Sequence, residues 1–496
     1  MGKLHKRRKG YSDEELDEEE ADFEDEEGEE DEIEEEDDEE DDEDEEDDED
    51  DEIDDEDEEY DEEEERRAYR RRRRIRNQII VYLVIFFVAA GIVGGGIAVG
   101  RKAASFVKQK KQEAAEEKAK EEAAEQQEPE EEMVIDTPEP VEEEPEEEDI
   151  LGELAESYYS EMSIENKVAG LFMVTPESIT GVKTATQAGD GTQEALNQYA
   201  VGGLIYFGQN ILDKEQITKM LSNTASMSNY PIFLAVDEEG GEVSRVANSK
   251  VEVTKVEDMA AIGAGGDASL AADAGTTIGS YLNEIGFNVD FAPVADVAGE
   301  GSALGSRSFG SDPQAVGDMV SNAVGGIEGT GVSACLKHFP GLGSTSEDTH
   351  DGRVEITKSL DEMRASDFVP FSAGIEAGAD FVMVSHATAP ALDEDNVPSS
   401  LSKKVITDIL RGELGFEGIV ITDALDMTAI TDYYTPEEAA VMALEAGADM
   451  LLMPEDFEKA YNAVLAAVQD GTISEERINE SLDRIYRVKC AGKLEN

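Results

Sequence analysis

Eight short apolar runs, separated by amphipathic stretches, limit most strongly what this chain can fold into. The runs are Val168–Val174, Val201–Phe207, Pro231–Asp237, Phe287–Val294, Val332–Phe339, Asp380–Ala387, Gly418–Ala424 and Asp449–Pro454. Segments of helix-like composition lie between them, for example at 267–286 and 435–448. Short apolar strands that alternate with helices predict a parallel sheet covered by helices, and eight such units favour an α/β fold of the (β/α)8 TIM-barrel type over an open doubly wound sheet. The first run is not followed by a Gly-x-Gly-x-x-Gly turn, which also argues against a dinucleotide-binding fold.

The first part of the chain has a different composition. Asp13–Glu65 is almost unbroken Asp and Glu and carries much of the formal net charge of −80. Because so few apolar residues cannot offset the entropy of ordering, we expect residues 1–78 to be a solvated, disordered tail. Its negative charge argues against a nucleic-acid partner. Docking of a basic cytosolic protein is the alternative to a charge run without a specific partner.

An apolar segment follows the acidic tail. Ile79–Val99 carries no charge and is long enough to cross a bilayer as one helix. It begins too far from the N-terminus, and its apolar core is too long, for a cleaved signal peptide. The arginine cluster Arg66–Arg76 is denser than the Arg101–Lys102 pair on the other side. The positive-inside rule therefore predicts a single-pass bacterial membrane protein with a cytoplasmic N-terminus and an extracellular remainder.

The segment after the apolar helix separates it from the predicted barrel. Residues 100–150 are rich in Glu, Ala and Pro and are expected to form a charged stalk that carries the folded domain, 151–496. Cys335 and Cys490 are the only cysteines, and both are expected to be unpaired. An outer domain without disulfides is typical of a bacterial surface rather than of a cysteine-rich secreted module.

Polar residues gather where the predicted strands end, which is where barrels place their active sites. They are Asp237 after the third strand, Lys337 and His338 at the fifth, Ser385 and His386 at the sixth and Asp423 at the seventh, with Arg245 and Arg307 in the loops after the third and fourth. One charged residue at a strand end could form a structural ion pair. Several at one rim indicate a functional site.

The stretch KHFPGLGSTSEDTH, Lys337 to His350, concentrates residues suited to proton transfer. The chain has only four histidines, and His338 and His350 both lie here, together with Asp348. Histidine exchanges protons near neutral pH more readily than any other side chain. A single histidine at a strand end can also be a hydrogen-bonded structural group, so the pattern needs support from the rest of the chain.

Five motifs, in order, give that support. They are DEEGGEVSR from Asp237, NVDFAPVADV from Asn288, SRSFGSDP from Ser306, KHFPGLGSTSEDTH, and LGFEGIVITDALDM from Leu414. Together with ALEAGADMLLMP they resemble glycoside hydrolase family 3, specifically its single-barrel bacterial β-N-acetylglucosaminidase (β-N-acetylhexosaminidase) branch. The resemblance covers Leu151 to Lys493.

The resemblance implies roles for the catalytic residues. Asp423 matches the nucleophile of a retaining mechanism, and a carboxylate at a strand end can form a covalent glycosyl-enzyme. Asp426 is the rival and should lie in the following loop or helix. His350 matches the general acid and base, and Asp348 matches the aspartate that orients it. Such a carboxylate fixes the imidazole tautomer and supports the imidazolium.

The resemblance also implies a sugar-binding set: Asp237, Arg245, Arg307, Lys337 and His338. Charged side chains form strong hydrogen bonds with hydroxyl groups. One position departs from the family loop, KHFPGHG, because Leu342 replaces the second histidine. We expect this change to affect loop packing or the site beyond the cleaved sugar, and not to inactivate the enzyme. Because the resemblance ends at Lys493, we expect no second domain of the kind that the family's β-glucosidases have.

These residues imply an exo-acting, membrane-anchored β-N-acetylhexosaminidase that removes terminal N-acetylglucosamine from cell-wall or related glycans. No metal or organic cofactor is expected, since no Cys, His and carboxylate cluster has metal-ligand spacing. Two alternatives stay open. The first is a phosphorylase, because a histidine tolerates an incoming phosphate better than a carboxylate does, and the second is an inactive barrel that binds wall glycans.

Overall fold

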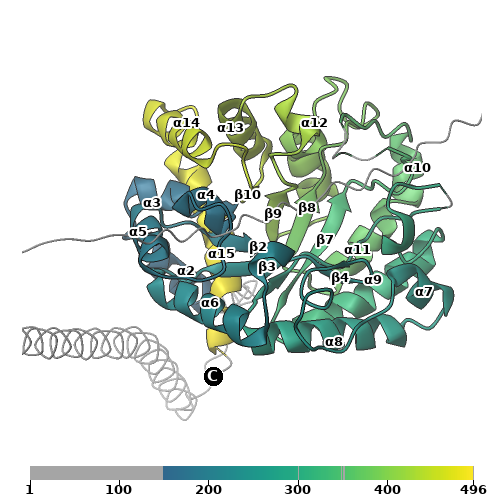
Figure 1. The fold of residues 1–496 in the computed structure, drawn as a ribbon. Helices are drawn as coiled ribbons and strands as arrows, with labels where there is room; N and C mark the ends of the chain where they lie inside the picture. The colour runs from purple at the N-terminus through teal and green to yellow at the C-terminus, as the bar shows by residue number, and fades with distance from the viewer. Residues whose placement is uncertain (1–148, 300, 348, 350–351, 495–496) are drawn as a thin grey trace, which may run out of the picture. The chain divides into compact units, whose positions relative to one another are not determined.

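The computed structural model describes residues 149–299, 301–347, 349 and 352–494 (Figure 1). The predicted tail, the predicted membrane helix at 79–99 and nearly all of the stalk lie outside these residues, as do Asp348 and His350. Among the described residues no helix is both long and apolar enough to cross a membrane. The membrane helix and the orientation of the chain therefore stay predictions.

Eight parallel strands form one sheet, and each lies within one of the eight apolar runs. In sheet order they are β10 (Leu451–Leu452), β1 (Phe172–Val174), β2 (Gly203–Tyr206), β3 (Phe233–Val236), β6 (Val289–Asp290), β7 (Ser333–Phe339), β8 (Phe381–Val384) and β9 (Ile419–Thr422). The two edges meet, since the Thr422 N–H donates to the Met450 carbonyl at 3.1 Å and the Leu425 N–H to the Leu452 carbonyl at 2.9 Å. The predicted α/β barrel of TIM type is the observed architecture.

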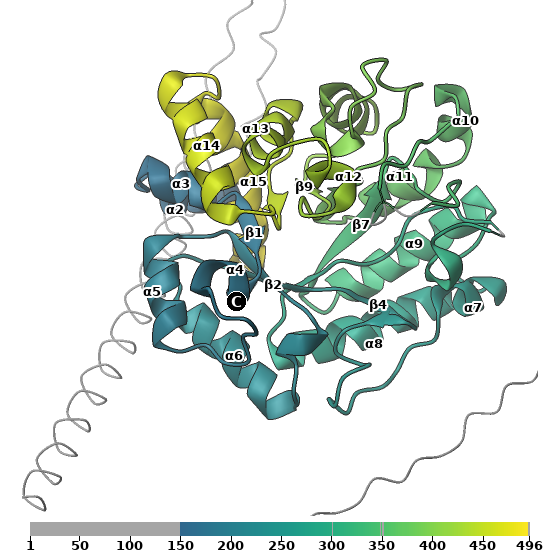
Figure 2. The ribbon, with the colours of Figure 1, turned by 45° about the horizontal axis from the view of Figure 1, so that its top comes forward.

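Helices surround the strands (Figure 2). The α-helices are α2 (Ile150–Tyr159), α3 (Ile164–Ala169), α4 (Pro176–Thr180), α5 (Asp190–Gln198), α6 (Lys214–Met227), α7 (Met259–Ala264), α8 (Ser269–Ile285), α9 (Pro313–Glu328), α10 (Leu360–Ala365), α11 (Phe368–Glu376), α12 (Thr428–Thr431), α13 (Pro436–Ala446), α14 (Phe457–Asp470) and α15 (Glu475–Leu494). The described residues also contain short 3-10 turns, η1 (Gly208–Asn210), η2 (Gly305–Arg307) and η3 (Ser399–Leu401), and a π-helical segment, η4 (Lys404–Glu413). The two helix-like segments of the sequence correspond to α8 and α13.

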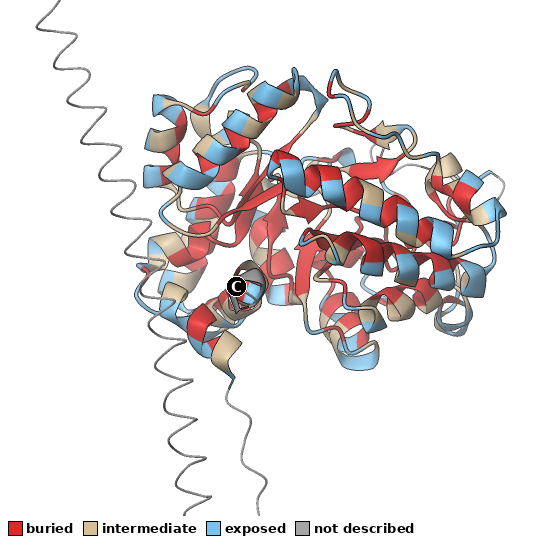
Figure 3. Ribbon diagram, turned by 90° about the horizontal axis from the view of Figure 1, so that it is seen from below, coloured by how far each residue is buried: buried red, intermediate tan, exposed pale blue. Residues whose placement is uncertain are grey.

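Local sequence explains where α13 begins and ends. Thr435 caps its N-terminus and shares a reciprocal capping box with Glu438, while Pro436 fills the first turn. Gly447 ends the helix in the left-handed conformation, with φ of 114°. The inner faces of the helices and all eight strands are buried (Figure 3), and both cysteines are buried. Cys335 forms no disulfide, as predicted.

The first and last helices of the described barrel lie against each other. Asp149 caps α2 and also pairs with Arg487 of α15, with Oδ1 at 2.9 Å from Nη1. The rings of Tyr158 and Tyr486 stack with centroids 5.5 Å apart. Both ends of the domain are thereby joined beside the barrel.

One element was not expected from the sequence. The stretch DEEGGEVSR forms a small antiparallel hairpin of β4 (Glu238–Gly240) and β5 (Val243–Ser244) directly after the third barrel strand. Gly240 and Gly241 make its turn with φ of 94° and 58°, a region in which side chains other than glycine are strained. The hairpin sets the positions of several charged groups at the rim.

Candidate active site

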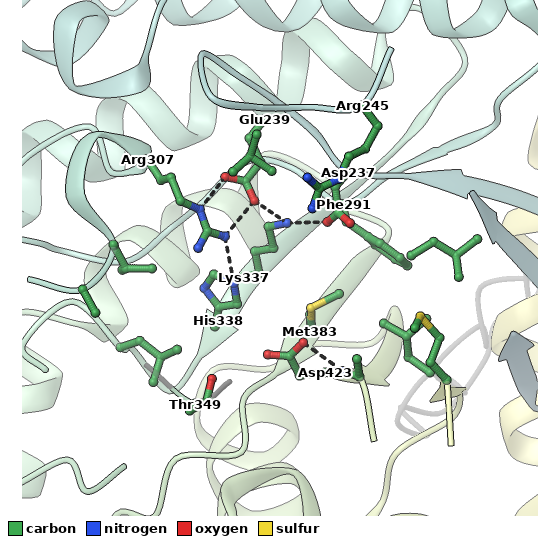
Figure 4. A pocket seen from close by; sticks show the side chains of 18 of the residues that line it. Asp237, Glu239, Arg245, Phe291, Arg307, Lys337, His338, Thr349, Met383 and Asp423 are labelled. Atoms are coloured by element: carbon green, nitrogen blue, oxygen red, sulfur yellow. Dashed lines mark hydrogen bonds and ion pairs between the residues drawn. The ribbon is translucent and has the colours of Figure 1, made fainter. Parts of the chain in front are cut away.

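A cavity of about 260 Å³ opens at the carboxyl ends of the strands (Figure 4). Its polar wall comes from the ends of the third, fifth and seventh barrel strands and from the loops after the third and fourth: Asp237, Glu239, Arg245, Arg307, Lys337, His338 and Asp423. Apolar side chains such as Phe207, Phe291, Leu342 and Met383 complete the lining. All five predicted sugar-binding residues and the predicted nucleophile therefore lie around one cavity.

Lys337 joins two carboxylates at the floor of the polar wall. Its Nζ lies 2.8 Å from Asp237 Oδ1 and 2.6 Å from Glu239 Oε1. Arg307 holds the same glutamate in a bidentate pair, with Nε–Oε2 and Nη2–Oε1 both at 2.8 Å. Such paired contacts fix a guanidinium in one orientation. Asp237, Lys337 and Arg307 are therefore aligned before any sugar arrives.

Glu239 is the central carboxylate of this wall, and only 3% of it is exposed. Burial alone would raise its pKa, but the charges of Lys337 and Arg307 and their hydrogen bonds outweigh burial and lower the pKa to about 2. Lys337 is affected in the same way: burial would lower its pKa, but the negative charges of Asp237 and Glu239 raise it. Glu239 is thus ionised at neutral pH and balances two cations.

The other glutamate of the hairpin holds the segment around Arg245. Glu238 is buried, and its carboxylate accepts the N–H groups of Val246 at 2.7 Å and Ala247 at 2.8 Å. The Tyr281 hydroxyl donates to it at 2.7 Å. Burial raises the pKa of Glu238 although these hydrogen bonds oppose the shift. Glu238 thereby holds Val246, the residue next to Arg245, in place.

Arg245 has donor capacity to spare. Its guanidinium carbon lies 5.9 Å from the centre of the Phe207 ring, and its side chain lines the cavity. Its Nε is buried and has no hydrogen-bond partner among the described residues. A buried donor without a partner is uncommon in a folded protein.

His338 is held by Asp296, a residue that the sequence reasoning did not single out. Asp296 Oδ2 lies 2.7 Å from His338 Nδ1 and accepts the His338 N–H at 3.0 Å, while Oδ1 accepts the Leu342 N–H at 2.6 Å. The other ring nitrogen, Nε2, lies 3.3 Å from Arg307 Nη2. Since a guanidinium only donates, Nε2 accepts and Nδ1 carries the proton. His338 is therefore arranged as an acceptor at the cavity.

Asp423 follows β9 and lies across the cavity from the Asp237–Lys337 pair (Figure 4). Its N–H donates to the Val384 carbonyl at 2.9 Å, and its Oδ1 accepts the Ala424 N–H at 2.8 Å. Burial would raise the pKa of Asp423, but its surroundings, which include the Ala424 N–H and the charge of Lys337, hold it below its ordinary value. The carboxylate is thus ionised and directed into the cavity. Asp426, its rival in the sequence, is exposed and does not line the cavity.

Four predicted positions differ from the rest. Asp348 and His350 lie outside the described residues, although their neighbours Glu347 and Thr349 line the cavity. Ser385 and His386, expected at the rim because they end the sixth strand, are fully buried and do not line it. Met383 is the residue of β8 that lines the cavity. Leu342 lines the cavity, and its anchor to Asp296 is a backbone contact that any residue could make.

A family model described as "Glycosyl hydrolase family 3 N terminal domain" matches residues 163–488. This chain belongs to glycosyl hydrolase family 3. The prediction of a glycoside hydrolase is confirmed, and the family 3 barrel is the part of the chain that carries the cavity. In the part of the chain that the structure describes, no group of three or more Cys, His, Asp or Glu side chains could hold a metal ion.

Individual relatives place this family 3 chain more narrowly. A β-hexosaminidase of Stenotrophomonas maltophilia (strain R551-3) is 36% identical over 274 residues, which cover 54% of this chain and 81% of the relative. "Beta-hexosaminidase A" of Pseudoalteromonas piscicida is 33% identical over 327 residues, 60% of this chain and 54% of the relative. The chain thus spans about half the length of one relative and most of the other. The predicted resemblance to the β-N-acetylhexosaminidase branch is confirmed.

Solved structures agree with this placement. A glycoside hydrolase family 3 β-N-acetylglucosaminidase from Paenibacillus sp. str. FPU-7 matches with a TM-score of 0.63 and 36% identity, over 68% of this chain and 64% of that one. The structure named "M tuberculosis LpqI" matches with a TM-score of 0.60 and 29% identity, over 68% of this chain and 96% of that one.

Sequence reasoning missed Glu239 and Asp296, although both lie within recognised motifs. Glu239 is the second of two adjacent glutamates before Gly240 and Gly241, and this pattern of acids followed by a Gly-Gly turn signals a hairpin. Asp296 is the penultimate residue of the motif NVDFAPVADV, two residues beyond its apolar run. Attention to the strand ends alone passed over both.

Proposed function

We propose that this family 3 enzyme is a membrane-anchored, retaining β-N-acetylhexosaminidase that removes terminal N-acetylglucosamine from cell-wall or related glycans. The observation that carries the proposal is the ionised Asp423 facing a prearranged wall of Asp237, Lys337 and Arg307 across one small cavity. The β-hexosaminidase names of the relatives support the substrate class.

The dimensions of the cavity support an exo-acting enzyme. Its volume of about 260 Å³ lies just below the range of ordinary ligand pockets, which begins at about 300 Å³. One terminal sugar fits such a space. In this proposal Asp237, Arg245 and Lys337 bind hydroxyl groups of the sugar. Arg307 and His338 lie beside these residues on the same wall and complete the sugar-binding set.

The proposed reaction has two steps. Asp423 attacks the anomeric carbon, the bond to the leaving oxygen breaks, and His350 gives that oxygen its proton. Water then attacks the anomeric carbon of the glycosyl-Asp423 ester, His350 takes its proton, and the carboxylate is released with the sugar in its original β configuration. Asp348 fixes the tautomer of His350 in both steps. Asp423 is suited to the first step, since its lowered pKa keeps it ionised.

Asp423→Asn tests the nucleophile. The amide is nearly isosteric but cannot form the ester, so kcat on an aryl N-acetylglucosaminide should fall by about 10³-fold or more while the fold is retained. Asp426→Asn is the matched control, because Asp426 is exposed and outside the cavity lining. An inactive Asp426→Asn beside an active Asp423→Asn would contradict the assignment.

Products separate the proposed hydrolase from its alternatives. Wild-type enzyme should release free N-acetylglucosamine from the aryl substrate at the same rate with and without inorganic phosphate. Formation of N-acetylglucosamine 1-phosphate would identify a phosphorylase instead. Binding of N-acetylglucosamine oligosaccharides without any cleavage would identify an inactive wall-binding barrel.

A further inference from the structure

His386 contacts the turn that carries the proposed nucleophile, although it lies outside the cavity lining. It follows β8 and is fully buried. Its Nε2 lies 2.8 Å from the Ala424 carbonyl oxygen, and its Nδ1 lies 2.7 Å from the Ser400 hydroxyl. The two ring nitrogens thus connect the segment after the sixth strand with the segment after the seventh.

The partners of the ring determine where its proton lies. A carbonyl oxygen only accepts, so Nε2 must carry a proton and donate it to Ala424. Ser400 is itself fixed within η3, where its N–H donates to the Ser385 carbonyl at 3.0 Å. The imidazole is therefore held at both ends, and its donating nitrogen always faces Ala424.

Ala424 links His386 to Asp423 through two hydrogen bonds. Its N–H donates to Asp423 Oδ1 at 2.8 Å, while its carbonyl accepts both His386 Nε2 and the Met427 N–H, the latter at 3.1 Å. The Asp423 N–H donates to the Val384 carbonyl, two residues before His386. The end of β8 therefore holds Asp423 from one side and Ala424 from the other.

We propose that His386 is a positioning residue that holds Ala424 through its Nε2–H, so that the Ala424 N–H keeps one oxygen of Asp423 fixed and the carboxylate directed at the anomeric carbon. The proposal rests on the function given above, in which Asp423 is the nucleophile. Placement of a reacting group is worth much in rate, since an error of about 1 Å costs about 100-fold. His386 itself has no access to the cavity and takes no part in proton transfer to the substrate.

Two conservative variants separate the two ring nitrogens. In His386→Gln the amide nitrogen reaches the position of Nε2 and can still donate to Ala424. In His386→Asn the amide occupies the position of Nδ1, so it can meet Ser400 but leaves the Ala424 carbonyl. Both variants keep a polar side chain in a buried polar site, so both are expected to fold.

The measurement is covalent labelling of the full chain by a 5-fluoro glycosyl fluoride of N-acetylglucosamine, followed by intact mass. This probe forms a glycosyl-enzyme that is hydrolysed only slowly, so the labelled protein accumulates. The maximal labelling rate therefore reports attack by Asp423, and the half-saturating probe concentration reports sugar binding. His386→Asn should lower the maximal rate by about 10-fold or more, with half-saturation unchanged. His386→Gln should stay within about threefold of wild type.

Phe381→Leu controls for loss of core packing in the same strand. Its ring packs on Phe233, with centroids 5.2 Å apart, at the opposite end of β8 from His386. This variant should lose stability and keep the labelling rate. The proposal is overturned if His386→Asn and His386→Gln label equally fast, or if Phe381→Leu is slowed as much as His386→Asn.

The same experiment tells the two proposals apart. If wild-type protein is not labelled at Asp423, the proposed function fails before any variant of His386 is compared. If wild type is labelled at Asp423 and the Asn and Gln variants do not differ, the enzyme assignment stands and the role of His386 is wrong.

Discussion

At the scale of single residues, Glu239 holds together the wall that we propose binds the sugar. Among the described residues it is the carboxylate that contacts both Lys337 and Arg307, and it is almost completely buried. Removing one partner from a buried charge network leaves the other charges uncompensated, which costs several kcal/mol. Asp237 alone would then balance Lys337, and Arg307 would lose both of its short contacts.

Glu239→Gln should therefore lower kcat/KM by about 100-fold and destabilise the fold by about 3 kcal/mol at neutral pH. Because folding lowers the pKa of Glu239 from 4.5 to about 2, its stabilising effect is present above pH 4.5 and is lost as the pH falls through about 2. Urea unfolding across this range should show the difference from wild type shrinking with acidity. Exposed Glu242→Gln, in the same hairpin, is the control. A difference that grows as the pH falls would contradict this assignment.

His350 acts in both proposed steps, so its removal has a two-part signature. Good aryl leaving groups need little protonation, so His350→Ala should slow their release far less than that of a sugar leaving group. The second step still needs a base, so the glycosyl-enzyme should accumulate after a burst of aryl alcohol. Azide needs no base and should restore turnover as the β-glycosyl azide. Equal losses on good and poor leaving groups, with no burst and no rescue, would rule out His350.

At the scale of elements, helix α2 belongs to the barrel although it precedes the first strand. It lies against α15 through Tyr158 and Tyr486 and through the Asp149–Arg487 pair. None of its residues lines the cavity. We therefore expect α2 to stabilise the domain without contributing to catalysis.

Leu154→Ala tests this expectation, because Leu154 is buried on α2 with 4% of it exposed. Loss of the buried side chain should reduce the free energy of unfolding by about 2–4 kcal/mol, measured by urea denaturation. KM and kcat should stay at wild-type values at 25 °C. Exposed Glu156→Ala should change stability by less than about 0.5 kcal/mol. A change in KM without a change in stability would contradict the separation of α2 from the site.

At the scale of the whole molecule, we propose that residues 79–99 anchor the chain with the barrel outside. The asymmetry between Arg66–Arg76 and Arg101–Lys102 supports this orientation. A protease added to intact cells should therefore remove the barrel and leave the acidic tail protected, as followed with antibodies against each part. Lysed cells, in which both parts are cleaved, are the control. Recovery of a protected barrel would reverse the proposed orientation.

The sequence by itself determined the eight strands and their order, because a strand buried on both faces must be apolar and must end where polar residues begin. It also placed Asp423, Lys337 and Asp237 at one rim, since parallel strands share one carboxyl edge. Only the tertiary structure paired Arg307 with Glu239 and Lys337 with Asp237, which are 68 and 100 positions apart. It also showed that His386, expected at the rim, is buried outside the cavity lining. Strand ends are read from local composition, but partners across the barrel depend on the path of loops that no local pattern fixes.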